Sequence, residues 1–179
     1  MTTHRDYKAA SSEWASNIAN LRPWRYLVTL TYRDGLTGSE SITSKQLKDW
    51  AKHVQKRYSG RFEYVAFPEH MDHGRFDHLH LLLYISTLEP VQDSADGLRR
   101  VSIGAAIKSA WRFGFSDVKT ISKGSKNRTG AASYVVKDFG ANTPIFMSDS
   151  LARPLPDLTP RVRRSIADQM AAHNGARTA

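Results

Sequence analysis

Residues 77–83, Asp-His-Leu-His-Leu-Leu-Leu, place two imidazoles two positions apart within an apolar run. On a β-strand, residues two apart point to the same face, so His78 and His80 would project together, with Cα atoms about 6.5 to 7 Å apart. A shift of one residue in register would bury both of them. Two imidazoles on one open face are suited to share a metal ion. The residues that would point the other way, into a core, are Leu79, Leu81, Leu83 and Ile85.

A carboxylate stands close enough in sequence to complete such a metal site. Glu69 ends an apolar stretch, and an eight-residue loop separates it from His78. A hairpin would return Glu69 to the histidines and give a two-histidine, one-carboxylate site with open positions for a phosphate oxygen and water. His70 or His73, both in the loop, could replace Glu69 as third ligand. The alternative without a metal is a pair of exposed histidines on a half-buried strand.

A tyrosine later in the chain is a candidate nucleophile. Tyr134-Val-Val-Lys137 lies in a predicted helix from about residue 130 to 139, in which residues three apart share a face. A free tyrosine phenol has a pKa of about 10, so it needs a polarised phosphate and a nearby cation to react at neutral pH. We therefore predict Tyr134 as the nucleophile and Lys137 as its helper. The alternative is a surface tyrosine beside an ordinary lysine.

The elements that would position these residues follow from hydrophobic periodicity. The order is β-α-β-β-α-β-α, which suits an α+β, ferredoxin-like fold, an antiparallel sheet covered by helices on one face. Thr43 and Gln46 resemble a capping box for the first of the helices between strands, and Thr129 an N-cap for the last helix. The predicted strands are 24–32, 62–69, 78–85 and 115–122, and the predicted helices are 13–20, 44–58, 101–112 and 130–139.

The last part of the chain differs in composition. Four prolines between Pro144 and Pro160 predict an extended linker, followed by a basic helix over about residues 161–174. We therefore divide the chain into a nuclease-type domain over residues 1–143 and a linker with a basic tail over residues 144–179.

Charge and composition narrow the class of protein. The 179 residues include 26 Lys and Arg against 17 Asp and Glu, a formal net charge of +9, for which a polyanion is a natural partner. The chain has no cysteine, which excludes disulfides and thiolate metal ligands and fits a reducing compartment. It contains no apolar run of about 18 residues and no signal peptide, so we expect a cytoplasmic protein of a prokaryotic cell without a membrane partner.

Three segments in a fixed order resemble a known family. They are Leu-Val-Thr-Leu-Thr-Tyr at 27–32, the block from Glu69 through Gly74-Arg75 to His78-Leu-His80, and Tyr134-Val-Val-Lys137. Together they resemble the three motifs of the HUH endonucleases, specifically the single-tyrosine rolling-circle replication initiators (Rep proteins) of phages and plasmids. The resemblance covers about residues 25–140. Asp138 stands where a second active-site tyrosine would be sought, which argues against the two-tyrosine subgroup.

The resemblance implies an HUH nuclease fold with a five-stranded antiparallel sheet, and Mn²⁺ or Mg²⁺ held by His78, His80 and Glu69. It implies nicking and joining of single-stranded DNA, often at a hairpin origin. Tyr134 would stay joined to the 5′ phosphate with Lys137 as its helper, and a free 3′ hydroxyl would be released for a host polymerase. The sequence lacks the Gly-x₄-Gly-Lys-Ser/Thr phosphate loop, so a host helicase would unwind the DNA.

Basic and aromatic residues around these motifs are candidates for DNA contacts. A flexible basic loop is predicted over residues 123–130, ahead of Tyr134. Phe76, Tyr84 or Trp111 could stack on unpaired bases, although core packing is the preferred interpretation of Trp111. The candidate phosphate contacts are Arg75, Lys119, Lys123, Lys126 and Arg128.

Other functions remain open on the sequence. A single-strand transposase of the same superfamily often has Gln where this chain has Lys137, and relaxases usually carry the tyrosine ahead of the histidine pair. Both differences favour a replication initiator. A non-catalytic domain that binds single-stranded nucleic acid is the alternative outside enzymes, and covalent trapping of an oligonucleotide separates it from the nuclease. No sequence feature speaks for a repressor or a protein-interaction module.

Overall fold

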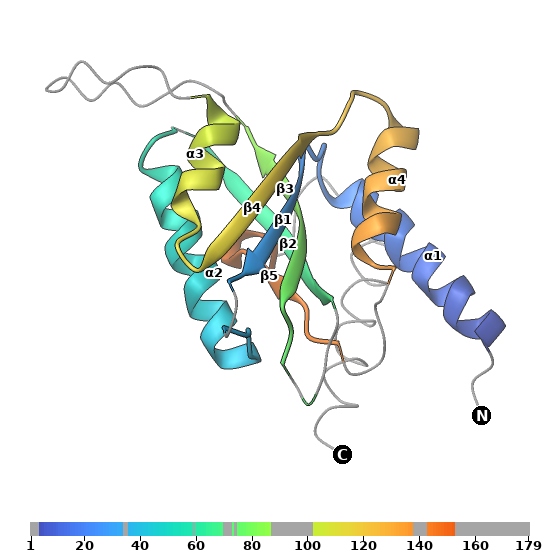
Figure 1. Ribbon diagram of the computed structural model, residues 1–179. Helices are drawn as coiled ribbons and strands as arrows, with labels where there is room; N and C mark the ends of the chain where they lie inside the picture. Colours follow the sequence, from blue (N-terminus) through green and yellow to red (C-terminus); the bar gives the residue numbers. More distant parts are fainter. Residues whose placement is uncertain are drawn as a thin grey trace, which may run out of the picture.

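The structure, a computed structural model, is an α+β fold built on an open five-stranded antiparallel sheet (Figure 1). The strand order is β4-β1-β3-β2-β5, and its first four strands have the order of a ferredoxin-like sheet. The described residues are 4–33, 36–58, 60–69, 73, 75–86, 102–137 and 143–152. The elements are α1 (His4–Leu21), β1 (Tyr26–Tyr32), α2 (Glu40–Gln55), β2 (Phe62–Glu69), β3 (His78–Ile85), α3 (Ile103–Ala110), β4 (Gly114–Thr120), α4 (Ser125–Val135), β5 (Phe146–Met147) and α5 (Asp149–Ala152).

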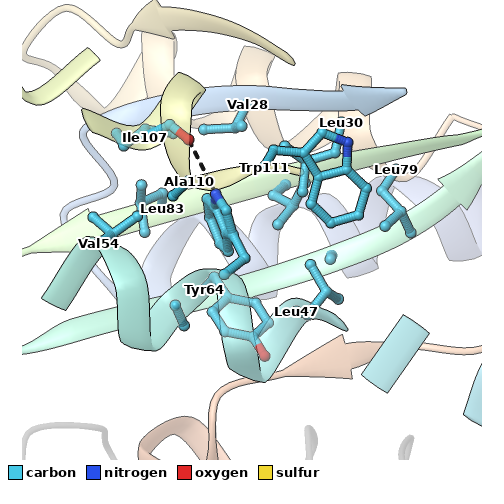
Figure 2. Close-up of a cluster of buried hydrophobic side chains, with 14 of the residues drawn as sticks. Val28, Leu30, Leu47, Val54, Tyr64, Leu79, Leu83, Ile107, Ala110 and Trp111 are labelled. Atoms are coloured by element: carbon cyan, nitrogen blue, oxygen red, sulfur yellow. Dashed lines mark hydrogen bonds between the residues drawn. The ribbon is translucent and has the colours of Figure 1, made fainter. Parts of the chain in front are cut away.

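One face of the sheet packs against α2 and α3 to form the larger core (Figure 2). The four apolar residues of β3 predicted to face a core, from Leu79 to Ile85, all lie in it. The Trp50 indole N–H donates to the Ile107 carbonyl oxygen at 3.1 Å, drawn as the dashed line in Figure 2, and this bond joins the two helices. This face is therefore closed.

The opposite face, which carries His78 and His80, is covered in part by α1 and α4 (Figure 1). Ile18 of α1 and Val135 of α4 belong to the apolar cluster on this face, together with Leu82 of the histidine strand. The prediction that helices cover only one face was wrong, because α1 and α4 each have an apolar stripe that buries itself against the second face. A smaller, partly open surface remains there for a site.

The predicted capping box of α2 was also wrong. The helix begins at Glu40 with Ser39 as its N-cap, so Thr43 and Gln46 lie inside it. Both bind the hydroxyl of Tyr32, which donates to Gln46 Oε1 at 2.7 Å and lies 2.8 Å from Thr43 Oγ1. Their role is to satisfy a buried polar group of β1 rather than to cap a helix end.

The basic segment ahead of Tyr134 is helical for most of its length. Helix α4 begins at Ser125, after Gly124, whose φ of 125° is left-handed and is therefore most easily adopted by glycine. Thr129 lies within this helix and is not its N-cap. The helix therefore starts about five residues earlier than the sequence pattern predicted, and it ends at Val135, two residues before Lys137.

Part of the predicted linker belongs to the sheet. Strand β5 pairs with β2 through Val65 and Met147, and α5 follows it directly. The interpretation of residues 144–152 as linker was therefore wrong, since two of them supply the fifth strand. The predicted basic tail lies outside the described residues. Within the described part of the chain, no helix is long and apolar enough to cross a membrane.

Gly114, at the start of β4, is required by close approach of two backbones. A Cβ atom placed there would lie 2.0 Å from the carbonyl oxygen of Thr31 on β1. We expect Gly114→Ala to lower the free energy of unfolding by about 1–3 kcal/mol, the range for forced overpacking. Gly104→Ala in α3 is the control, because a Cβ there meets nothing within 4 Å and helix propensity should raise stability by about 0.5–1 kcal/mol. Urea denaturation measures both, and equal stabilities would contradict the backbone clash.

Candidate active site

The register of the sheet brings the predicted metal ligands onto one face. Glu69 lies directly opposite His78, and Phe67 lies opposite His80. Thr29 and Thr31 of β1 face the two histidines from the other side. Cross-strand partners project to the same face of an antiparallel sheet, so these side chains share a surface.

Glu69 is the centre of the contacts on this surface. Its carboxylate is buried, with one oxygen against His80 Nε2 and the other accepting a hydrogen bond from Lys137 Nζ. Burial alone would raise the pKa of the Glu69 carboxyl, but the hydrogen bonds from Lys137 and His80 outweigh it and lower the pKa to about 2. The carboxylate is therefore ionised at neutral pH and is shared between a cation and an imidazole.

His80 is buried, which differs from the exposed position that we predicted. It is 4% exposed because the end of α4 covers it, whereas the side chain of His78 is 33% exposed. Burial lowers the pKa of His80, and the opposing hydrogen bond with Glu69 does not restore it. The neutral imidazole is thereby favoured, and this is the form that ligates metals.

Each histidine has an oxygen atom beside its Nδ1. Thr29 Oγ1 lies 3.1 Å from Nδ1 of His80, and the Asp77 carboxylate lies 2.8 Å from Nδ1 of His78. A hydroxyl can donate or accept, so Thr29 can hold the His80 ring in either tautomer. We did not predict these two partners. Asp77 is adjacent to His78 in sequence, but Thr29 becomes recognisable only once β1 is known to pair with β3.

Tyr134 lies beside this group although it comes from a different layer of the fold. Its ring is packed edge-on against the His80 ring, with centroids 4.8 Å apart and an interplanar angle of 68°. Lys137 Nζ lies 4.9 Å from the centroid of the same ring. Tyr134 is 44% exposed, so the phenol is open to solvent on one side. Lys137 reaches it from beyond the helix end, not from the shared helix face that the spacing suggested.

The group has the donor chemistry of a divalent metal site. It contains an ionised carboxylate, a neutral imidazole and a second imidazole directly opposite the carboxylate in register. Oxygen partners at the Nδ1 atoms are typical of metal-ligating histidines, because they orient the Nε2 atoms. Glu69 and His80 are already in contact, while among the described residues no three His, Asp or Glu side chains are gathered in a metal-binding arrangement. The residues therefore fit Mn²⁺ or Mg²⁺ in kind. Of the two alternative third ligands, His70 lies outside the described residues, and the side chain of His73 is exposed.

The candidate phosphate contacts fall in two places. Arg75 is exposed just before β3. The other four follow one another along β4 and the beginning of α4, where Lys119 has a 74% exposed side chain. Lys123 and Lys126 are exposed, and Arg128 is half-buried. The positive charge is therefore concentrated along the connection from the edge strand to the helix that carries Tyr134 (Figure 1).

Two of the predicted stacking residues are unsuited to that role. Phe76 is 1% exposed and Trp111 is 4% exposed, and both belong to the core under α2 and α3. The Trp111 indole N–H donates to the Thr31 carbonyl oxygen at 3.1 Å, which anchors α3 to β1. Tyr84 is half-buried on the histidine face.

Comparison with known proteins identifies the family. A search of the curated proteins and of the solved structures found no match to this chain. A family model does match, over residues 25–142, and this range includes all three motifs and the site described above. It describes replication-associated proteins of the ORF2 type. Because the match covers well over half of the chain, the protein belongs to the ORF2 family of replication-associated proteins.

Proposed function

We propose that this replication-associated protein nicks and rejoins single-stranded DNA through Tyr134 and so initiates rolling-circle replication. One observation carries the proposal: the Tyr134 ring, His80, Glu69 and Lys137 form one contact group, although they come from α4, β3, β2 and the segment after α4. A nucleophile, a general cation and metal-type ligands around one point are what a phosphoryl-transfer site requires.

The proposed reaction is a reversible exchange of one phosphate ester for another. The Tyr134 phenolic oxygen attacks the phosphorus, the bond from phosphorus to the 3′ oxygen breaks, and a 5′-phosphotyrosine forms. The phenolic proton is released, and the 3′ oxygen leaves as a hydroxyl. Because the new ester retains the bond energy, a 3′ hydroxyl can attack it and rejoin a strand, releasing the tyrosine.

Lys137 is positioned to assist this step. Its ammonium group contacts Glu69 and lies 4.9 Å from the centre of the Tyr134 ring. A cation at that position favours the phenolate over the phenol, and it offsets negative charge on the attacked phosphate. When bound by His78, His80 and Glu69, Mn²⁺ or Mg²⁺ would supply Lewis-acid polarisation of a phosphate oxygen.

The metal assignment can be tested without any activity measurement. We expect His80→Ala to weaken Mn²⁺ binding by at least ~100-fold in titration calorimetry, since loss of a direct ligand exceeds the 10–100-fold loss for an outer partner. His53→Ala is the matched control, because His53 lies on α2 and contacts the Asp49 carbonyl oxygen on the other side of the sheet. Unchanged Mn²⁺ affinity in His80→Ala would refute the metal site.

The function itself is tested by mapping covalent products. The protein is incubated with a library of circular single-stranded DNA and Mn²⁺, and protein-linked 5′ ends are sequenced while the modified peptide is identified by mass spectrometry. The expected result is linkage to Tyr134 at a restricted set of sequences, together with free 3′ hydroxyl ends. Binding of the library without any protein–DNA linkage would instead support a non-catalytic binding domain. Host helicase and polymerase partners remain part of the proposal, as does a hairpin at the origin.

A further inference from the structure

The most exposed large apolar side chain among the described residues is Phe115, at 73%. It lies on β4, an edge strand whose residues alternate between the two faces of the sheet. Val118 of this strand packs toward the core under α2 and α3, so Phe115, an odd-numbered residue, points to the histidine face. A single exposed phenylalanine is common on protein surfaces. Its position relative to the site is what gives this one significance.

Phe115 is the outermost member of a row that crosses the sheet to the candidate active site. It pairs with Thr31, Thr31 pairs with His78, and His78 pairs with Glu69. Adjacent strands are about 4.8 Å apart, so Phe115 lies two strands, or roughly 10 Å, from His78 along the row. Exposure rises along the row, from buried Glu69 through half-buried His78 and Thr31 to open Phe115. A strand of DNA that enters the site over this edge must pass the phenyl ring.

The charges around Phe115 suit a polyanion. Lys119, further along β4 on the same face, has a 74% exposed side chain, and the basic residues of the connection to α4 follow it. Asp117 lies between Phe115 and Lys119, and its carboxylate has Lys108 Nζ at 3.7 Å and Lys119 Nζ at 3.9 Å. The acidic group is thus matched by two cations, and the net charge at this edge stays positive.

We propose that Phe115 is a nucleobase-stacking site, where an unpaired base of the substrate strand lies on the phenyl ring while Lys119 contacts its backbone phosphate. Aromatic rings flanked by cations are the general means by which proteins bind single strands, because every base offers a π-face when it is unpaired. A duplex hides those faces, so this site would favour single strands. The proposal rests on the proposed function in that it names how the same site holds its substrate.

The test compares a strand with bases to one without them. Binding is measured in the Tyr134→Phe background, which removes the nucleophile, using fluorescent oligothymidylate of about twenty nucleotides and an abasic strand of equal length. We expect Phe115→Ala to weaken binding of oligothymidylate by about 5- to 100-fold and to leave the abasic strand nearly unchanged. Phe115→Trp should keep the affinity, and its added fluorescence should be quenched by oligothymidylate.

Ile42→Ala is the matched control. It also removes an exposed apolar side chain, 53% exposed, but from α2 on the opposite side of the sheet, so both strands should bind as before. Equal loss on both strands in Phe115→Ala, or no loss on either, overturns the stacking site. If the wild-type chain forms no covalent DNA adduct while the Phe115 effect holds, only the proposed nicking reaction fails. If adducts form and Phe115→Ala binds like the parent, only the stacking site fails.

Discussion

Tyr134→Phe is expected to abolish covalent linkage to DNA and to lower nicking by at least about a thousandfold, while binding of single-stranded DNA stays within twofold. The substitution removes only the attacking oxygen, and loss of a nucleophile is among the most damaging changes in enzymes that form covalent intermediates. The ring contacts with His80 and Lys137 need no hydroxyl, so the local packing should persist. Gel-shift of a labelled oligonucleotide in the presence of denaturant measures the covalent product.

Tyr84→Phe is the appropriate control for this result. Tyr84 lies on the histidine face of β3, six residues from His78, and it also loses one phenolic oxygen in the variant. We expect its nicking rate to equal that of the parent chain. A Tyr134→Phe protein that still nicks and forms adducts would mean that another group attacks the phosphate, and the assigned nucleophile would be wrong.

The second large effect concerns stability. Glu63→Ala is expected to lower the free energy of unfolding by about 3–5 kcal/mol, equivalent to a fall in Tm of roughly 6 to 20 °C. Glu63 is fully buried on β2 and binds the Arg22 guanidinium through both of its carboxylate oxygens, while Arg22 itself is 8% exposed. Removal of the carboxylate leaves a buried positive charge without its counter-ion, which costs far more than the intact pair contributes.

Two further variants separate this explanation from simple loss of packing. Arg61 Nε also donates to Glu63, at 2.8 Å, but the Arg61 side chain is 45% exposed, so Arg61→Ala should cost no more than about 1 kcal/mol. Arg22→Met combined with Glu63→Leu removes both charges together, and it should recover much of the stability lost in Glu63→Ala. A double variant no more stable than Glu63→Ala would contradict the charge argument. Urea denaturation followed by circular dichroism gives all four values.

This buried ion pair is linked to the candidate active site through two helices. Arg22 follows α1 directly, and its ion pair fixes that end of the helix on β2. Helix α1 packs against α4 through Ile18 and Val135, and α4 carries Tyr134. A protein without the pair is therefore expected to lose its active-site geometry at a lower temperature than the parent chain does.

Local sequence pattern was enough to predict the strands that bear the metal-type residues. The observed bounds of β2 and β3, Phe62–Glu69 and His78–Ile85, agree with the prediction because alternation of polar and apolar residues has the period of a strand. The same alternation placed His78 and His80 on one face, opposite to the leucines. The order of elements likewise predicted the ferredoxin-like sheet, since short hairpins and crossover helices leave few ways to connect the strands.

Tertiary structure alone decided which side chains meet. Glu69 lies opposite His78 in register, but its carboxylate contacts His80 and Lys137, because α4 and the segment after it fold over that corner of the sheet. The same covering made His80 buried and left Phe115 open at the edge. Periodicity records which face a residue prefers, whereas distances between faces depend on the packing of elements far apart in sequence. For that reason the chemistry of the site could be predicted residue by residue, but its assembly required the folded chain.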